Sequence, residues 1–216
     1  MVEREKAKDM NRAKIRAAAE TIIRTEGMEK LTMRRLADVA GVSLRTPYNL
    51  FGSKTEVLLA LLDGAQFDPF QNSPARESLP ALAALLGALD HAEATFEEDE
   101  AYFRVVFREI MVSDPIEAQA AAVDGVLAIG QAFAIQALNS GELKDGTDAK
   151  ELGRHLGIQL TAILGMWATG FFSNKESMRQ TRRGWAGVLL NHCTDTSRPL
   201  IEAMYQATTS AEEPAP

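Results

Sequence analysis

The chain has 216 residues and a formal net charge of −7, and its apolar and charged contents are those of a water-soluble globular protein. Its one cysteine, Cys193, excludes an intrachain disulfide and a cysteine-rich metal site. The N-terminus is too charged to be a secretory signal, and the uncharged run 156–172 is shorter than a membrane span. We therefore expect a cytoplasmic protein that does not enter the membrane.

Charge is divided unevenly along the chain. Residues 1–56 contain 12 Lys or Arg and 8 Asp or Glu, which gives +4, whereas residues 57–216 contain 11 and 22, which gives −11. A basic segment on an acidic remainder confines affinity for polyanions such as DNA to the N-terminus.

Helical spacing of apolar residues predicts three helices in the N-terminal segment. The first runs over about 9–26, the second is capped by Thr32 and ends at Gly41, and the third follows Ser43 and ends near residue 51. Two short helices separated by a tight turn form the pattern of a helix-turn-helix. Binding of double-stranded DNA is therefore the leading functional hypothesis.

Beyond this segment the sequence contains helical patterns only. A capping box at 53–56 opens a further helix, and residues 67–78, with two prolines, are the predicted linker. Later helices are predicted over about 79–95, 100–112, 114–139, 148–172 and 176–192, with a short one after residue 199. The predicted fold is all-α, with a three-helix helix-turn-helix domain over 1–56, a larger helical domain over 57–207 and a disordered tail over 208–216.

Residues 12–58 carry a longer ordered pattern. The first helix ends at Gly27, and LTMRRLA at 31–37 precedes Gly41-Val42-Ser43, Tyr48, Phe51 and Ser53-Lys54. This pattern resembles the DNA-binding domain of TetR-family transcriptional regulators. The resemblance implies a homodimer on a palindromic operator, a second domain that binds a small-molecule effector and forms the dimer, and repression as the default action.

The third predicted helix has an outward face suited to base edges. Arginine pairs with guanine, asparagine with adenine, and apolar groups contact the thymine methyl. The candidate base-contacting residues are Leu44, Arg45, Thr46 and Asn49. Thr32, Tyr48 and Lys54 match family positions that hold phosphates, and Arg34 matches one near the groove edge. Arg35 is expected to face water or form an ion pair.

Pro47 leaves the start of this helix open. If Ser43 caps the helix, Pro47 is its fourth residue and removes the first intrahelical hydrogen bond. If Thr46 caps it, Pro47 is the first helical residue and the helix is very short. We expect a distorted first turn that exposes Leu44 and Arg45.

Small residues spaced four apart indicate close approach of another helix, because each glycine costs about 1 kcal/mol relative to alanine in a helix interior. We predict that these small residues and the apolar residues beside them contact a second copy of the chain in a dimer. The alternative is that the small residues contact a helix of the same chain. The predicted dimer residues are Gly153, Gly157, Thr161, Gly165, Trp167, Trp185 and Leu189.

Effector pockets are mostly apolar with a few directed polar groups, so a small apolar or aromatic effector is expected. The candidate pocket residues are Tyr102, Phe103, Phe107, Gln136 and Gln159. The three histidines lack metal-ligand spacing, and nothing orients Cys193 for catalysis. We expect no enzyme activity, metal or cofactor. The alternative function is a helical small-molecule-binding or protein-interaction module with a vestigial DNA-binding head.

Overall fold

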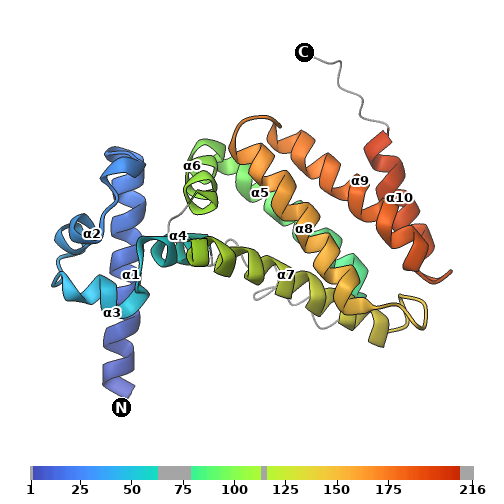
Figure 1. Ribbon diagram of the computed structural model, residues 1–216, viewed down its shortest axis with the longest axis horizontal. Coiled ribbons are helices and arrows are strands. Elements are labelled where there is room, and N and C mark those ends of the chain that lie inside the picture. The colour runs from blue at the N-terminus through green and yellow to red at the C-terminus, as the bar shows by residue number, and fades with distance from the viewer. Residues whose placement is uncertain (1, 63–78, 113–115, 210–216) are drawn as a thin grey trace. The chain divides into compact units, whose positions relative to one another are not determined.

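The computed structural model describes residues 2–62, 79–112 and 116–209, and within these ranges the regular secondary structure is helical (Figure 1). The predicted all-α fold class is confirmed. The predicted linker at 67–78 and the opening of a helix at Asp114 lie outside the described residues. The predicted disordered tail begins too early, because Thr208 is buried and Thr209 ends the last helix; the rest of that tail is also outside the described residues.

The chain divides into two compact units. The first comprises Met1–Asp68 and Ala101–Ala120, and the second comprises Pro69–Glu100 and Ala121–Pro216. The first unit therefore extends past the predicted boundary at residue 56 and includes a second stretch of chain.

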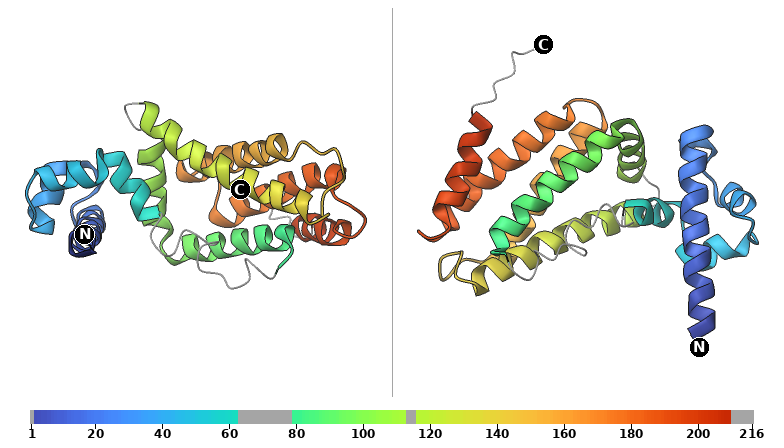
Figure 2. Two further views of the ribbon diagram at one scale, coloured as in Figure 1. Left: turned by 90° about the horizontal axis from the view of Figure 1, so that it is seen from below. Right: turned by 180° about the vertical axis from the view of Figure 1, so that it is seen from behind.

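The first unit is organised around its N-terminal helix, on which the next three α-helices pack (Figures 1 and 2). Its elements are α1 (Val2–Thr25), the 3-10 helix η1 (Met28–Lys30), α2 (Met33–Ala40), α3 (Arg45–Phe51), α4 (Lys54–Leu62) and most of α6 (Glu100–Met111). The core between α1, α2 and α4 contains Ile15, Ala19, Ile22, Leu36, Val57 and Leu58. Helix α1 starts earlier than predicted, and its exposed first turns include a Glu5–Lys8 ion pair at 3.5 Å.

Local capping chemistry sets the helix ends in this unit. The Thr32 hydroxyl accepts a hydrogen bond from the Arg35 amide at 3.1 Å, which confirms the predicted cap of α2. The Ser53 hydroxyl likewise accepts from the Glu56 amide at 3.1 Å and caps α4.

The second unit contains α5 (Ala81–Glu98), most of α7 (Ile116–Asn139), α8 (Ala149–Ala168), α9 (Asn174–His192) and α10 (Arg198–Thr209). Helix α9 packs on α5, α8 and α10 (Figure 1). The core of the second unit includes Leu85, Leu89, Phe133, Leu156, Trp185, Leu189 and Ile201. Helix α8 ends at Ala168 rather than near Phe172, because Gly170 adopts a left-handed φ of 84° and turns the chain.

Helices α7 and α8 approach each other at glycines. A Cβ added to Gly153 would lie 2.4 Å from the Gly130 carbonyl oxygen, and one added to Gly157 would lie 2.8 Å from the Leu127 side chain. This part of the predicted dimer ridge packs on α7 of the same chain, so its assignment to the dimer is wrong. The alternative given above, a helix of the same chain, is the arrangement observed.

Glu142 joins distant segments at one end of the second unit. Its carboxylate accepts hydrogen bonds from the backbone amides of Ala81 and Leu82 at 2.7 and 3.0 Å, at the start of α5. Its carbonyl accepts from the Thr194 amide at 3.0 Å. A carboxylate at a helix N-terminus is favoured by the unpaired amides and the helix dipole.

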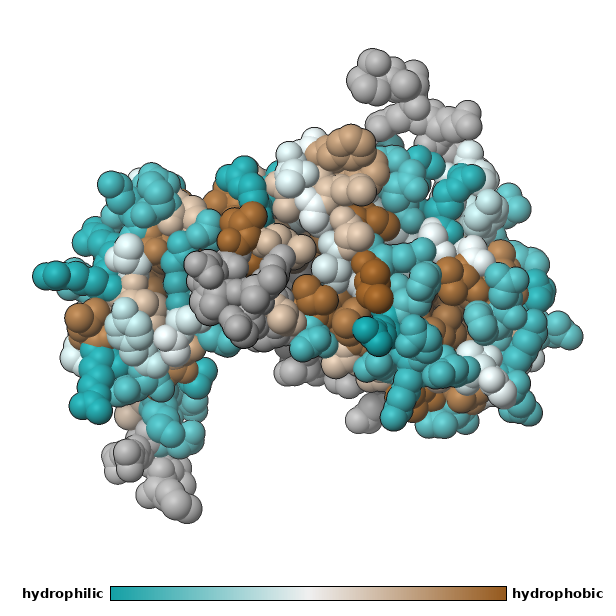
Figure 3. All heavy atoms as spheres, viewed as in Figure 1, coloured by the Kyte–Doolittle hydropathy of each residue, from teal (hydrophilic) through white to brown (hydrophobic). Residues whose placement is uncertain are grey.

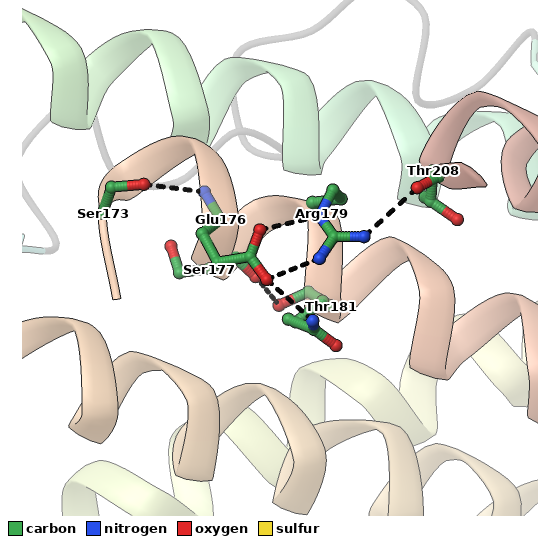
Figure 4. A network of polar contacts seen from close by, with 7 residues as sticks. Ser173, Glu176, Ser177, Arg179, Thr181 and Thr208 are labelled. Carbon is green, nitrogen blue, oxygen red and sulfur yellow. Dashed lines mark hydrogen bonds and ion pairs between the residues drawn. The ribbon is translucent and has the colours of Figure 1, made fainter. Parts of the chain in front are cut away.

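A polar network joins the start of α9 to the end of α10 (Figure 4). The Glu176 carboxylate accepts from the Arg179 Nε and Nη2 atoms at 2.7 and 2.6 Å, and Arg179 Nη1 donates to the Thr208 carbonyl at 3.3 Å. The Arg179 hydrogen bonds hold the pKa of Glu176 below its ordinary value of 4.5.

Acid should remove the contribution of this network to stability. Because the folded-state pKa of Glu176 is lowered, its stabilisation is complete above about pH 4.5 and is lost as the pH falls through the lowered pKa. We expect Glu176→Gln to lower the melting temperature at neutral pH and to match the parent chain in acid. Glu202→Gln is the control, since Glu202 is more exposed and lies 3.7 Å from Arg198. Equal pH dependence in both variants would contradict the prediction.

Candidate DNA-binding interface

Helices α2 and α3 form a helix-turn-helix. Gly41 ends α2 with a left-handed φ of 66°, as predicted, and the Val42 amide donates to the Ala37 carbonyl at 3.0 Å. These contacts turn the chain sharply into α3, which packs on both α1 and α2.

Neither predicted start of α3 is the observed one. The helix begins at Arg45, so Pro47 is its third residue, where an amide has no intrahelical acceptor. The Ser43 carbonyl accepts instead from the Thr46 amide at 2.8 Å, one residue earlier than an α-helical bond. The expected distorted first turn is therefore confirmed as a tightened turn. Pro47 is buried and anchors this turn.

This turn presents several of the candidate base-contacting side chains to solvent. Leu44, Arg45 and Asn49 are exposed, and Arg45 and Asn49 lie four residues apart on one face of α3. Thr46 is half-buried, and its hydroxyl lies 2.8 Å from the Ser43 hydroxyl. Thr46 is the least available of the four.

The candidate phosphate-binding residues differ in how freely they are presented. Arg34 and Tyr48 are exposed, whereas the Thr32 hydroxyl caps α2. The Lys54 ammonium lies 2.6 Å from a carboxylate oxygen of Glu109 on α6, within the same unit.

Arg35 forms an ion pair, the second of the two arrangements expected from the sequence. Its Nε and Nη2 atoms donate to the two carboxylate oxygens of Glu26 at 3.0 and 2.6 Å. These hydrogen bonds are the main cause of the lowered pKa of Glu26 and the raised pKa of Arg35. Arg35 therefore braces α2 against the end of α1.

Two arginines of α1 have roles that the sequence did not reveal. The Arg12 guanidinium lies 5.2 Å from the centre of the Phe51 ring at the end of α3, and that of Arg24 lies 4.3 Å from the centre of the Tyr102 ring on α6. Both arginines lie off the apolar face of α1, which indicates that they are not core residues. That position does not predict which aromatic ring each one contacts.

The five candidate pocket residues lie in different compact units. Tyr102, Phe103 and Phe107 belong to the first unit, and Gln136 and Gln159 to the second. Gln136 is exposed because α7 buries its other face, and the Gln159 amide lies against Gly184 of α9. Residue type was the reason for grouping them, and it does not show which helices meet.

Three of the predicted dimer residues belong to the core of a single chain. Trp167 is fully buried, stacks on Phe96 with ring centres 4.6 Å apart, and donates from its indole nitrogen to Glu100 at 3.0 Å. Trp185 donates to the Leu156 carbonyl at 3.0 Å, and Leu189 is buried. Assigning these three to the dimer was wrong, because large apolar groups on α8 and α9 already fill the space inside the unit. Thr161 and Gly165 are half-buried at its edge.

Within residues 2–62, 79–112 and 116–209, no helix is both long and apolar enough to cross a bilayer. In the same residues, no cluster of three or more His, Cys, Asp or Glu side chains is placed to hold a metal ion.

Residues 15–61 match the model of the bacterial regulatory proteins, tetR family. Comparison with curated proteins gives no match.

Similar solved structures extend over most of the chain. FadR of Thermus thermophilus, a TetR-family transcriptional repressor in complex with lauroyl-CoA, is 20% identical with a TM-score of 0.61, over 80% of this chain and 91% of that one. SmeT in complex with triclosan is 21% identical with a TM-score of 0.60, over 87% and 93%. The TetR regulator TylP of Streptomyces fradiae is 18% identical with a TM-score of 0.60, over 97% and 94%. At these identities the likeness shows the fold.

A helix-turn-helix head matched by this family model defines a DNA-binding regulatory protein. Residues 15–61 belong to the tetR family by that model, and the chain as a whole shares the fold of solved TetR-family regulators.

Proposed function

We propose that the chain is a homodimeric repressor that binds a palindromic operator and releases it when a small effector binds. The exposed face of α3 within the family-matched segment carries this proposal, with Arg45 and Asn49 directed away from the core. Such a face at the N-terminal end of the second helix of a helix-turn-helix is the part that enters the major groove.

Selection of bound sequences from random duplex DNA tests the proposal. We expect a palindrome whose half-sites lie about one helical turn apart, roughly 34–36 Å, because two heads related by a two-fold axis read two half-sites. Absence of any enriched sequence would contradict the proposal and favour the alternative of a vestigial head.

The corrected packing moves the proposed dimer surface to the other side of α8. Ile158 and Met166 are each 46% exposed, and the exposed Ala162 lies between them at a spacing of four. Next to this face, the Gln159 amide of α8 lies against Gly184 of α9. Apolar side chains are also visible on the side of the second unit where α8 lies in front (Figures 1 and 3). A second copy would bury this face.

Met166→Glu is expected to convert the dimer to a monomer, because it places an unpaired charge in an apolar interface. Molar mass by light scattering measures the change. Ile129→Glu on α7 is a matched control, since Ile129 is 47% exposed and lies on another helix. The surface is misassigned if Met166→Glu keeps the parent mass or if both variants dissociate alike.

The proposed effector is small and apolar or aromatic. Two structures with this fold hold lauroyl-CoA and triclosan, each of which has a large apolar part. An effector releases DNA only if it binds the DNA-incompetent arrangement more tightly. The test is a fluorescence anisotropy measurement of the chain bound to a labelled duplex of the selected sequence. Titration with each of these two compounds shows whether an effector of this chemical class releases the DNA. Unchanged DNA affinity at saturating concentrations of both would count against it.

A further inference from the structure

The contact between Lys54 and Glu109 joins the DNA-binding head to α6. Lys54 is the first residue of α4 and follows α3 after two residues, Gly52 and Ser53. Its ammonium lies 2.6 Å from Glu109 Oε1, and the two side chains are 33% and 31% exposed. Both residues belong to the first compact unit.

Packing holds the Glu109 carboxylate in place. Tyr102 and Glu109 lie seven residues apart on one face of α6, with the fully buried Val106 between them. Tyr102 receives the Arg24 guanidinium of α1, while Glu109 meets Lys54 of α4. Two contacts to different helices of the head therefore set the position of this face of α6.

A carboxylate in this place opposes DNA binding. A phosphate held at the start of α4 would need the Lys54 ammonium, which already faces an anion at hydrogen-bond distance. Two anions cannot both take the short contact to one ammonium without repelling each other. We propose that Glu109 is an autoinhibitory competitor of the DNA phosphate for Lys54, and that it keeps DNA affinity below the level the basic residues would otherwise supply. This inference rests on the proposed function of DNA binding.

A double-mutant cycle in the full-length chain tests the competition. The probe is a labelled random-sequence duplex of about 40 bp at about 100 mM salt, since phosphate contacts do not depend on sequence. Glu109→Gln should tighten binding about two- to fivefold, the range of a partly exposed ion pair. Glu56→Gln removes an equal charge from the exposed side of the same first turn of α4 and should tighten binding less. In a Lys54→Gln background, the excess effect of Glu109→Gln should vanish.

Each outcome decides the question. Equal effects of Glu109→Gln and Glu56→Gln, or an excess that persists without Lys54, would overturn the competition while leaving DNA binding intact. A parent chain that fails to bind the duplex at low salt would overturn both proposals. Circular dichroism and melting temperature establish that each variant is folded. Should Glu109→Gln unfold, Glu109→Asp shortens the reach by one methylene and should give a smaller tightening that still requires Lys54.

Discussion

Arg45→Ala is expected to weaken binding to the selected operator by about 1–3 kcal/mol, which is roughly 5- to 150-fold, and to relax one base position. Arg45 is the first residue of α3 and is exposed. The tightened turn before Pro47 holds it at the N-terminal end of α3, the helix that we propose enters the major groove. Binding to random duplexes should fall much less, because the lost contact is to a base.

Arg34→Ala is the matched comparison for this variant. Arg34 is an exposed arginine of α2 for which we propose a contact near the groove edge, so its loss should weaken operator and random DNA by similar factors. Anisotropy titrations of both duplexes with both variants measure the difference. Similar losses on operator and random DNA for Arg45→Ala would remove its proposed role in base recognition.

Gly153→Ala is expected to destabilise the chain by about 1–3 kcal/mol, the usual cost of overpacking a tight contact. The added Cβ would lie 2.4 Å from the Gly130 carbonyl oxygen and 2.5 Å from the Gln131 Cα. Because both are backbone atoms, α7 and α8 must separate to make room. Urea unfolding measures the change.

Gly87→Ala in α5 is the matched control. Gly87 is an exposed helical glycine, and a Cβ added there meets no atom within 4 Å. It should stabilise the chain by roughly 0.5–1 kcal/mol, the helix preference of alanine over glycine. If both variants changed stability alike, the close approach of α7 and α8 would be wrong.

The starts of α2, α4 and α8 were predictable because caps act within a few residues. Asp148 accepts from the Glu151 amide at 3.0 Å and caps α8, just as Thr32 and Ser53 cap α2 and α4. The start of α3 was harder to place. The two sequence-based alternatives made Pro47 the fourth or the first residue of the helix, whereas α3 begins at Arg45 and makes it the third. The tighter turn before it needs no amide from Pro47.

The sequence by itself determined that this protein is helical, that a basic helix-turn-helix stands at its N-terminus, and that Arg45 and Asn49 share an outward face. These features depend on residues close together in the chain, and their helical spacing determines the face on which each side chain lies. Only the tertiary structure decided what each face meets: α7 against Gly153, Arg24 against Tyr102, and Glu109 against Lys54. Helical periodicity specifies a direction but not a neighbour, because the neighbour is set by long-range packing.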